Sequence, residues 1–321
     1  LHYPLRRQRQ MCIRDRMWGP QEEAESIATL HAAVDAGINF FDSAEGYGAG
    51  RSEQLIGKAF KGMRDKVIIA TKVSQRNLRP RDVRAACEKS LKTLAMDHID
   101  VYYLHWPNWN IPFEETMGEM GHLRDEGKIR FVGCSNFGKR DLTDMLEVGR
   151  VEANQLAYNL LFRAVEHEIV PACIENQVGI ACYSPLLHGV LAGKYARLAD
   201  VPDNRARTRH FSNRTQTRHG GPGVEAETQV AFDKVRRICD EAGLPMAQVA
   251  LAWLLEQPAV ATVIAGASRT SQVLSNAKAA ELDLSDDIVA ALNAATEPVS
   301  YTHLRAHETV LDLVCRLLLE K

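Results

Sequence analysis

The sequence predicts an α/β fold, a (β/α)8 TIM barrel whose first strand is missing. Seven short apolar runs alternate with helical patterns, and this alternation is typical of βαβ units. The runs are apolar almost throughout rather than at every second residue, which indicates parallel strands that are covered on both faces. The chain of 321 residues is also long enough for such a barrel, which typically takes about 250 residues.

The predicted elements follow one another in a regular order. An open doubly wound sheet is the alternative, but it would carry a glycine-rich phosphate turn after an early strand, and the sequence has none there. We predict strands at 38–42, 67–71, 99–104, 130–134, 153–156, 179–183 and 260–265, and helices at 22–36, 52–61, 80–95, 113–127, 139–149, 167–177, 226–243 and 246–256.

One polar connection, residues 200–223, is longer than the others. It is rich in arginine and ends in the glycine-rich stretch GGPG at 220–223. A plain connection between two elements rarely needs such a length, and long loops of this kind are often functional. We therefore predict a large, mobile loop over the active site.

The two ends of the chain differ from the rest. Residues 1–16 contain five arginines without helical or strand periodicity, and residues 299–321 follow the helix-stop signal Glu297–Pro298. Both segments resemble translated sequencing adapters, which predicts a short metagenomic fragment with non-native ends and a native barrel at 17–298. The alternative is a genuine basic arm and a genuine amphipathic C-terminal helix.

Composition and charge exclude several classes of protein. The 39 basic and 41 acidic residues give a net charge of −2, which offers no electrostatic case for a nucleic-acid or membrane partner. No apolar run approaches the roughly 20 residues of a membrane span. The seven cysteines are scattered without a C-x-x-C pair, which argues against a structural zinc site and fits reduced thiols in a cytoplasmic protein.

Four titratable side chains lie near the ends of three consecutive predicted strands. Asp42 ends the first visible strand and is followed by Tyr47, while Lys72 and His105 follow the next two strands. Functional residues of such barrels come from the C-terminal strand ends, so these four side chains should share one face.

Together these four residue types suit the reduction of a carbonyl group. A lysine ammonium lowers the pKa of a nearby tyrosine from its usual value of about 10, and a carboxylate keeps that lysine charged and in place. A neutral histidine donates a hydrogen bond to a substrate carbonyl. Each residue alone could instead have a structural role. Asp42 could cap a loop, Tyr47 could be a loop aromatic, and Lys72 could lie at a solvated strand end. His105 could be a half-buried histidine whose hydrogen bonds are all made within the protein. The set of four on adjacent strand ends favours protonation of a carbonyl oxygen as hydride reaches its carbon.

Four stretches resemble signatures of the aldo-keto reductase superfamily. They are GINFFDSAEGYG at 37–48, LHWP at 104–107, GKIR at 127–130 with GCSNF at 133–137, and YSPL at 183–186 continuing to GKY at 193–195. The resemblance extends from about Trp18 to Glu297. It implies a TIM barrel that binds NADPH without a Rossmann motif and reduces aldehydes or ketones. It also implies that Tyr47 is the general acid, that Lys72 and Asp42 tune its pKa, and that His105 orients the carbonyl.

The same resemblance implies a set of cofactor-binding residues. A helix start that carries serine and arginine suits a 2′-phosphate, so NADP is favoured over NAD. Tyr183 could instead be a core aromatic. The implied residues are Ser135, Asn136 and Gln155 for the nicotinamide carboxamide; Tyr183 for stacking on its ring; Ser184, Pro185, Leu186, Gly189, Leu191, Gly193 and Lys194 for the pyrophosphate; Arg205 as a clamp from the long loop; and Gly266, Ser268, Arg269, Gln272 and Asn276 for the adenosine 2′-phosphate.

One departure from the family and two alternative functions stay open. Members of the family begin with a hairpin and a first strand that ends in a Gly-Thr-Trp-like turn, and here the resemblance begins after that turn, near Met17.

Some relatives are potassium-channel β subunits that bind the cofactor as a sensor, but these tend to lack the histidine, so His105 favours an enzyme. A barrel isomerase or lyase would need a metal or a Schiff-base site. The sequence determines neither the carbonyl substrate nor the oligomeric state.

Overall fold

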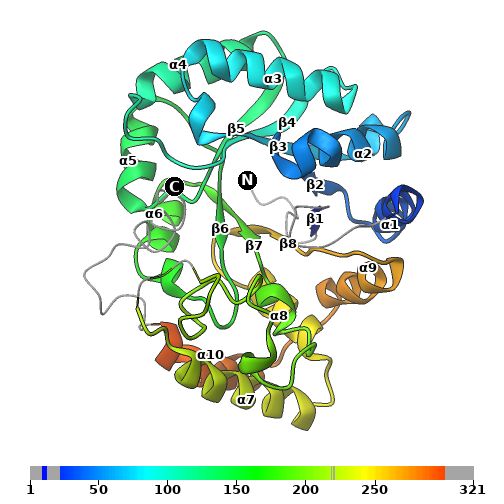
Figure 1. Cartoon of the computed structure of the whole chain (residues 1–321), viewed down its shortest axis with the longest axis vertical. Helices are drawn as coiled ribbons and strands as arrows, with labels where there is room; N and C mark the ends of the chain where they lie inside the picture. Colours follow the sequence, from blue (N-terminus) through cyan, green and yellow to red (C-terminus); the bar gives the residue numbers. More distant parts are fainter. Residues whose placement is uncertain (1–8, 13–21, 218, 220, 301–321) are drawn as a thin grey trace.

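Eight parallel strands form a closed barrel, in sequence order, in the computed structural model, which describes residues 9–12, 22–217, 219 and 221–300. Each strand pairs with its neighbours in sequence, and the first also pairs with the eighth. Figure 1 shows the helices around the outside of the strands, with α3 and α4 on one side and α7 and α10 on the opposite side. The predicted (β/α)8 TIM barrel is therefore confirmed.

The elements agree closely with the predicted ones. All seven predicted strands and all eight predicted helices are present, with small shifts at their ends. The strands are β1 (Arg9–Cys12), β2 (Phe40–Asp42), β3 (Ile68–Val73), β4 (Ile99–Leu104), β5 (Ile129–Ser135), β6 (Ala153–Ala157), β7 (Gly179–Tyr183) and β8 (Val260–Ile264). The helices are α1 (Glu23–Asp35), α2 (Arg51–Ala59), α3 (Pro80–Leu94), α4 (Phe113–Asp125), α5 (Lys139–Val148), α6 (Ile169–Glu175), α7 (Glu225–Glu241), α8 (Met246–Leu255), α9 (Thr270–Ala277) and α10 (Asp286–Ser300).

The prediction that the first strand is missing is wrong, because β1 closes the barrel. Gln10, Met11 and Cys12 stand opposite Phe40, Phe41 and Asp42 of β2, and β1 also pairs with β8. Main-chain groups make these pairings, so a segment without a strand-like pattern of side chains can occupy the gap between two strand edges. The strand lies within the segment predicted to be non-native; whether that segment is non-native stays a prediction.

The C-terminal end of the described chain also differs from the prediction. The helix-stop signal Glu297–Pro298 predicted that a helix ends there, yet α10 continues past Pro298 to Ser300. A proline in the last turn removes one hydrogen bond of the helix, so it does not have to end the helix at that residue. Residues 301–321, most of the second segment predicted to be non-native, lie outside the described residues.

The core has two layers, separated by the strands. A large cluster fills the space between the strands and the helices, and a small one, formed by Phe40, Ala70, Val101 and Tyr103, lies on the opposite face of the sheet, inside the barrel. Tyr103 stands opposite Gly133, where a Cβ atom would lie 2.4 Å from the tyrosine ring. This apolar filling occupies part of the barrel interior, and the polar groups gather towards the C-terminal strand ends.

The long loop between β7 and α7 is anchored to the core. Val201, Ala206, His210 and Phe211 of this loop are each at most 1 % exposed, and its predicted mobility stays a prediction. Gly223 closes the loop at a φ of +75°, and a Cβ atom there would lie 1.9 Å from the carbonyl oxygen of Phe211. The loop is therefore held by buried side chains and by a turn that requires glycine.

Within the described ranges, no single helix is long and apolar enough to cross a membrane, although α7 and α8, bent by 101°, meet that test of length and composition as a pair.

Candidate active site

A buried ion pair lies at the C-terminal ends of β2 and β3. Lys72 is 0 % exposed, and its Nζ donates to Oδ2 of Asp42 at 2.6 Å and to the carbonyl oxygen of Ser43 at 2.6 Å. The other carboxylate oxygen of Asp42 accepts from Nε2 of Gln155 at 2.9 Å. Both charges are thus desolvated but paired, and such a pair is strongly destabilised when one partner is removed.

Tyr47 and His105 complete the predicted catalytic group. Tyr47 begins a short 3₁₀ turn after β2, and the Nζ of Lys72 lies 5.0 Å from the centre of its ring. The rings of Tyr47 and His105 meet edge to face, with their centres 5.8 Å apart. His105 directly follows β4, where its backbone N–H donates to the carbonyl oxygen of Val73 in β3. The structure therefore brings all four predicted residues together.

The charge state of His105 follows from its surroundings. Burial, together with the smaller effect of the positive charge of Lys72, lowers the pKa of this imidazole from its usual value to about 3. Both effects disfavour a second positive charge beside the buried ammonium. His105 is therefore neutral at physiological pH and can donate a hydrogen bond from one of its ring nitrogens.

A second polar group lies at the ends of β5, β6 and β7. The Oγ of Ser135 donates to the carbonyl oxygen of Gln155 at 3.1 Å. The Nδ2 of Asn136 donates to the carbonyl oxygen of His105 and to Oγ of Ser135, each at 3.1 Å. The hydroxyl of Tyr183 donates to Oδ1 of Asn136 at 2.8 Å. Since Gln155 also contacts Asp42, these residues and the catalytic group form one continuous network.

The loop after β7 carries the residues predicted to meet the pyrophosphate. Ser184, Gly189 and Gly193 have positive φ values, and the backbone N–H groups of Gly189, Leu191, Gly193 and Lys194 donate to carbonyl oxygens of the same loop. These amides hold the loop in shape. The side chains of Pro185 and Leu191 are buried, that of Leu186 is half-buried, and Lys194 is exposed with its Nζ 5.6 Å from the ring centre of Tyr195.

Two further predicted groups lie on the long loop and at the start of α9. The guanidinium of Arg205 donates to the hydroxyl of Tyr195 at 3.2 Å, which joins the long loop to the loop after β7. The side-chain oxygen of Gln272 accepts from both the backbone N–H and the Oγ of Ser268. Gly266, Ser268, Arg269 and Gln272 are exposed and Asn276 is half-buried. Arg269, the N-cap residue of α9, thus presents its charge at a helix start.

Two contributors to this region were not predicted. The carbonyl oxygen of Ser43 accepts from Lys72, and the side chain of Asn159 donates to the carbonyl oxygen of Ser184. Every residue has a carbonyl oxygen, so the sequence cannot indicate which one accepts a hydrogen bond, and a single asparagine after a strand resembles any turn residue.

Among the described residues, no group of three or more histidine, cysteine or acidic side chains could hold a metal ion.

Comparisons with known proteins agree with the observed fold. The model of the aldo/keto reductase family matches residues 14–297. A probable aldo-keto reductase 1 from Glycine max is 33% identical over 281 residues, which cover 83% of this chain and 78% of that protein. A probable voltage-gated potassium channel subunit beta from Arabidopsis thaliana is 33% identical over 278 residues, with 81% and 83% covered. An aldo/keto reductase from Klebsiella pneumoniae, solved in complex with NADP and acetate, superimposes with a TM-score of 0.72 at 28% identity, covering 89% of both chains.

Proposed function

The chain belongs to the aldo/keto reductase family, a family of oxidoreductases, and from this premise we propose that it reduces aldehydes or ketones to alcohols with NADPH as the hydride donor. One observation carries the proposal. A fully buried ammonium, that of Lys72, is held by Asp42 at 2.6 Å and faces the ring of Tyr47, which in turn contacts a neutral His105. This arrangement stabilises negative charge on a tyrosine, which is the condition for an acidic phenol.

Tyr47 is the proton donor of the proposed reaction. The Lys72 ammonium stabilises the tyrosinate and so makes the phenol a stronger acid. His105 donates a hydrogen bond to the carbonyl oxygen and orients it. As a hydride reaches the carbonyl carbon, the carbonyl π bond breaks towards oxygen, and that oxygen takes the proton of the Tyr47 hydroxyl. Solvent then returns a proton to the tyrosinate.

The donor set of the site fits NADPH, which supplies the hydride when it is bound. Hydroxyl and amide side chains at Ser135, Asn136 and Gln155 match a carboxamide, which needs both donors and acceptors. The flat ring of Tyr183 at the end of β7 suits stacking on another flat ring. We assign the cations Lys194 and Arg205 to the pyrophosphate, because both belong to the loops that follow β7 and a cation binds a phosphate by charge-assisted hydrogen bonds.

The start of α9 supports NADPH over NADH. Arg269 and Ser268 are exposed at a helix N-terminus, where a guanidinium, a hydroxyl and the helix dipole all favour a phosphate. Only NADPH carries a phosphate at the adenosine 2′ position. We therefore assign these two residues to the 2′-phosphate.

A second candidate function follows from the relatives named as potassium channel β subunits. In that role the chain would bind NADPH as a partner protein rather than as an enzyme with substantial turnover. The presence of His105 beside Tyr47 favours the enzyme, because a sensor has no need of a group that orients a substrate carbonyl.

Oxidation of NADPH against a panel of aldehydes and ketones tests the proposal. We expect turnover of at least one small carbonyl compound by the wild-type chain and a large loss in the variant Tyr47→Phe. Tight NADPH binding without turnover of any carbonyl compound would favour the channel-subunit function. Absence of NADPH binding would overturn both candidates.

A further inference from the structure

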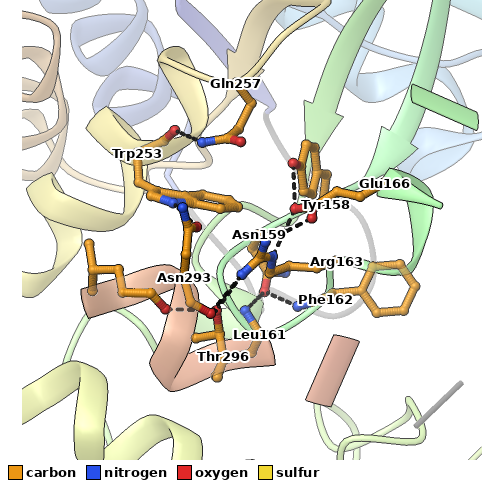
Figure 2. Close-up of polar contacts among 11 residues, drawn as sticks. Tyr158, Asn159, Leu161, Phe162, Arg163, Glu166, Trp253, Gln257, Asn293 and Thr296 are labelled. Atoms are coloured by element: carbon orange, nitrogen blue, oxygen red, sulfur yellow. Dashed lines mark hydrogen bonds and ion pairs between the residues drawn. The ribbon is translucent and has the colours of Figure 1, made fainter. Parts of the chain in front are cut away.

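The turn that follows β6, residues 158–163, contains a buried asparagine with three hydrogen bonds. Asn159 is 1 % exposed, and its Nδ2 donates to the carbonyl oxygen of Ser184 at 3.0 Å. Its Oδ1 accepts from the backbone N–H groups of Leu161 at 2.9 Å and Phe162 at 3.0 Å, as Figure 2 shows. Asn159 therefore joins its own turn to the loop after β7.

The residue that it holds has an unfavourable backbone conformation. Ser184 has a φ of +53°, in the left-handed region that few residues other than glycine adopt. Such a conformation persists when the surrounding structure holds it in place. The preceding Tyr183 is held as well, since its carbonyl oxygen accepts from the N–H of Tyr158 at 3.3 Å. The bend at Tyr183 and Ser184 is thus fixed by residues 158 and 159.

The same turn anchors the long loop. The Nε2 of His210, a residue with 0 % exposure, donates to the carbonyl oxygen of Leu161 at 2.9 Å. The N–H of that same Leu161 donates to Asn159, so one residue of the turn connects the asparagine to the loop that carries Arg205. A shift of Asn159 would therefore be transmitted to both loops.

The other end of the turn contacts α10, and it is joined to the first part through Glu166, which accepts from the hydroxyl of Tyr158 at 2.7 Å. Arg163 pairs with both carboxylate oxygens of Glu166 at 2.8 Å and donates to Oγ1 of Thr296 in α10 at 2.9 Å. In Figure 2 this branch extends from Arg163 to Thr296 and Asn293. These contacts secure α10, and none of them involves Ser184 or His210.

We propose that Asn159 is a positioning residue for cofactor binding, which holds the Tyr183–Ser184 bend and, through Leu161, the long loop. The inference rests on the proposed function for its cofactor, NADPH. Tyr183 and Ser184 would meet the nicotinamide and the pyrophosphate in an arrangement that Asn159 establishes before the cofactor arrives. The entropy cost of ordering the two loops is then incurred when the protein folds rather than when NADPH binds. This preorganisation increases the affinity for NADPH.

The variant Asn159→Asp tests the inference. It keeps the oxygen that accepts from Leu161 and Phe162, but it replaces the donating amide with an oxygen that cannot donate to Ser184. Without cofactor, we expect faster amide hydrogen exchange over residues 183–191 and 205–211. The Kd for NADPH, followed by quenching of tryptophan fluorescence, should rise about tenfold, the size of one buried hydrogen bond lost.

Thr296→Val is the matched control, because it removes a buried hydrogen bond from the same network on the side of α10. It should lower Tm and leave the Kd for NADPH unchanged. If the two variants raise the Kd in proportion to their loss of Tm, Asn159 is merely structural and the inference is overturned. The uncharged variant Asn159→Ser replaces Asn159→Asp if the latter does not fold.

Different experimental results would overturn this inference and the proposed function. A wild-type chain that binds no NADPH would overturn the proposed function and, with it, the role of Asn159 in cofactor binding. Unchanged exchange and an unchanged Kd in a folded Asn159 variant would overturn the inference alone.

Discussion

Replacing Lys72 with methionine removes the buried ammonium that faces Tyr47 and keeps the approximate length of the side chain. The ammonium lies 5.0 Å from the ring centre of Tyr47, and this distance sets the scale of its separation from a tyrosinate charge. At this distance, an effective dielectric constant of about 20 gives an attraction of about 3 kcal/mol. Each 1.36 kcal/mol is roughly a tenfold change in rate, so Lys72→Met should lower kcat by about 10²-fold.

The same substitution has a second effect that must be separated from the first. Asp42, which is 2 % exposed, loses its partner and keeps the amide of Gln155. Breaking a buried pair from one side costs about 3–5 kcal/mol of stability. A fall in activity could therefore come from partial unfolding rather than from a weaker acid.

The double variant with Asp42→Asn and Lys72→Met separates the two effects. It contains neither charge, and removal of both partners of a buried pair is often close to neutral for stability. We expect Tm to fall in Lys72→Met and to recover in the double variant, while kcat stays about 10²-fold below wild type in both. The assay is NADPH oxidation at saturating carbonyl substrate, with thermal melting in parallel. Recovery of kcat together with Tm would refute the electrostatic role of Lys72.

Three further outcomes are expected. Tyr47→Phe should lower kcat by about 10²-fold or more while the Kd for NADPH changes little, and wild-type turnover in this variant would exclude Tyr47 as the acid. Arg269→Ala should weaken NADPH binding roughly tenfold and NADH binding little, since one charge-assisted hydrogen bond contributes about 1.5–3 kcal/mol; equal affinity of the wild type for both cofactors would contradict the assignment. The pKa of His105 is lowered to about 3, so its imidazole should show no titration by NMR between about pH 5 and 8, and a midpoint near the usual value of about 6.5 would show that it is not desolvated. Because that folded pKa is depressed, His105 lowers stability as the pH falls below about 6.5, where the unfolded chain binds the proton and the folded chain does not.

The strand order and the main contacts of the site could be predicted because both follow from simple rules. Apolar runs between helical segments indicated parallel strands, and the C-terminal ends of neighbouring parallel strands lie side by side. Asp42 and Lys72 end two adjacent strands, so their contact required no knowledge of the loops. His105 directly follows β4 and Tyr47 lies five residues after β2, and both were expected on this face by the same rule.

The parts that sequence did not predict depend on main-chain groups or on long-range packing. The four residues of β1 have no strand-like pattern, and their pairing with β2 and β8 uses main-chain atoms that every residue possesses. The long loop is polar in composition, yet His210 and Phe211 are buried, and His210 donates to the carbonyl oxygen of Leu161, a residue distant in sequence. Local sequence patterns indicate the secondary structure that a segment prefers. The contacts of β1 and of the long loop depend instead on which main-chain and side-chain groups elsewhere in the barrel still need a partner.

The electrostatics of the site explain why tyrosine rather than histidine is the acid in the proposed reaction. Lys72 is fully buried and paired with Asp42, so the fold fixes the position of its ammonium. A second cation nearby would be repelled, and burial disfavours it further, which keeps His105 neutral. The same positive charge favours the tyrosinate. In the proposed reaction, one ammonium therefore disfavours the imidazole as the acid and favours the phenol, so that His105 would orient the carbonyl while Tyr47 would supply the proton.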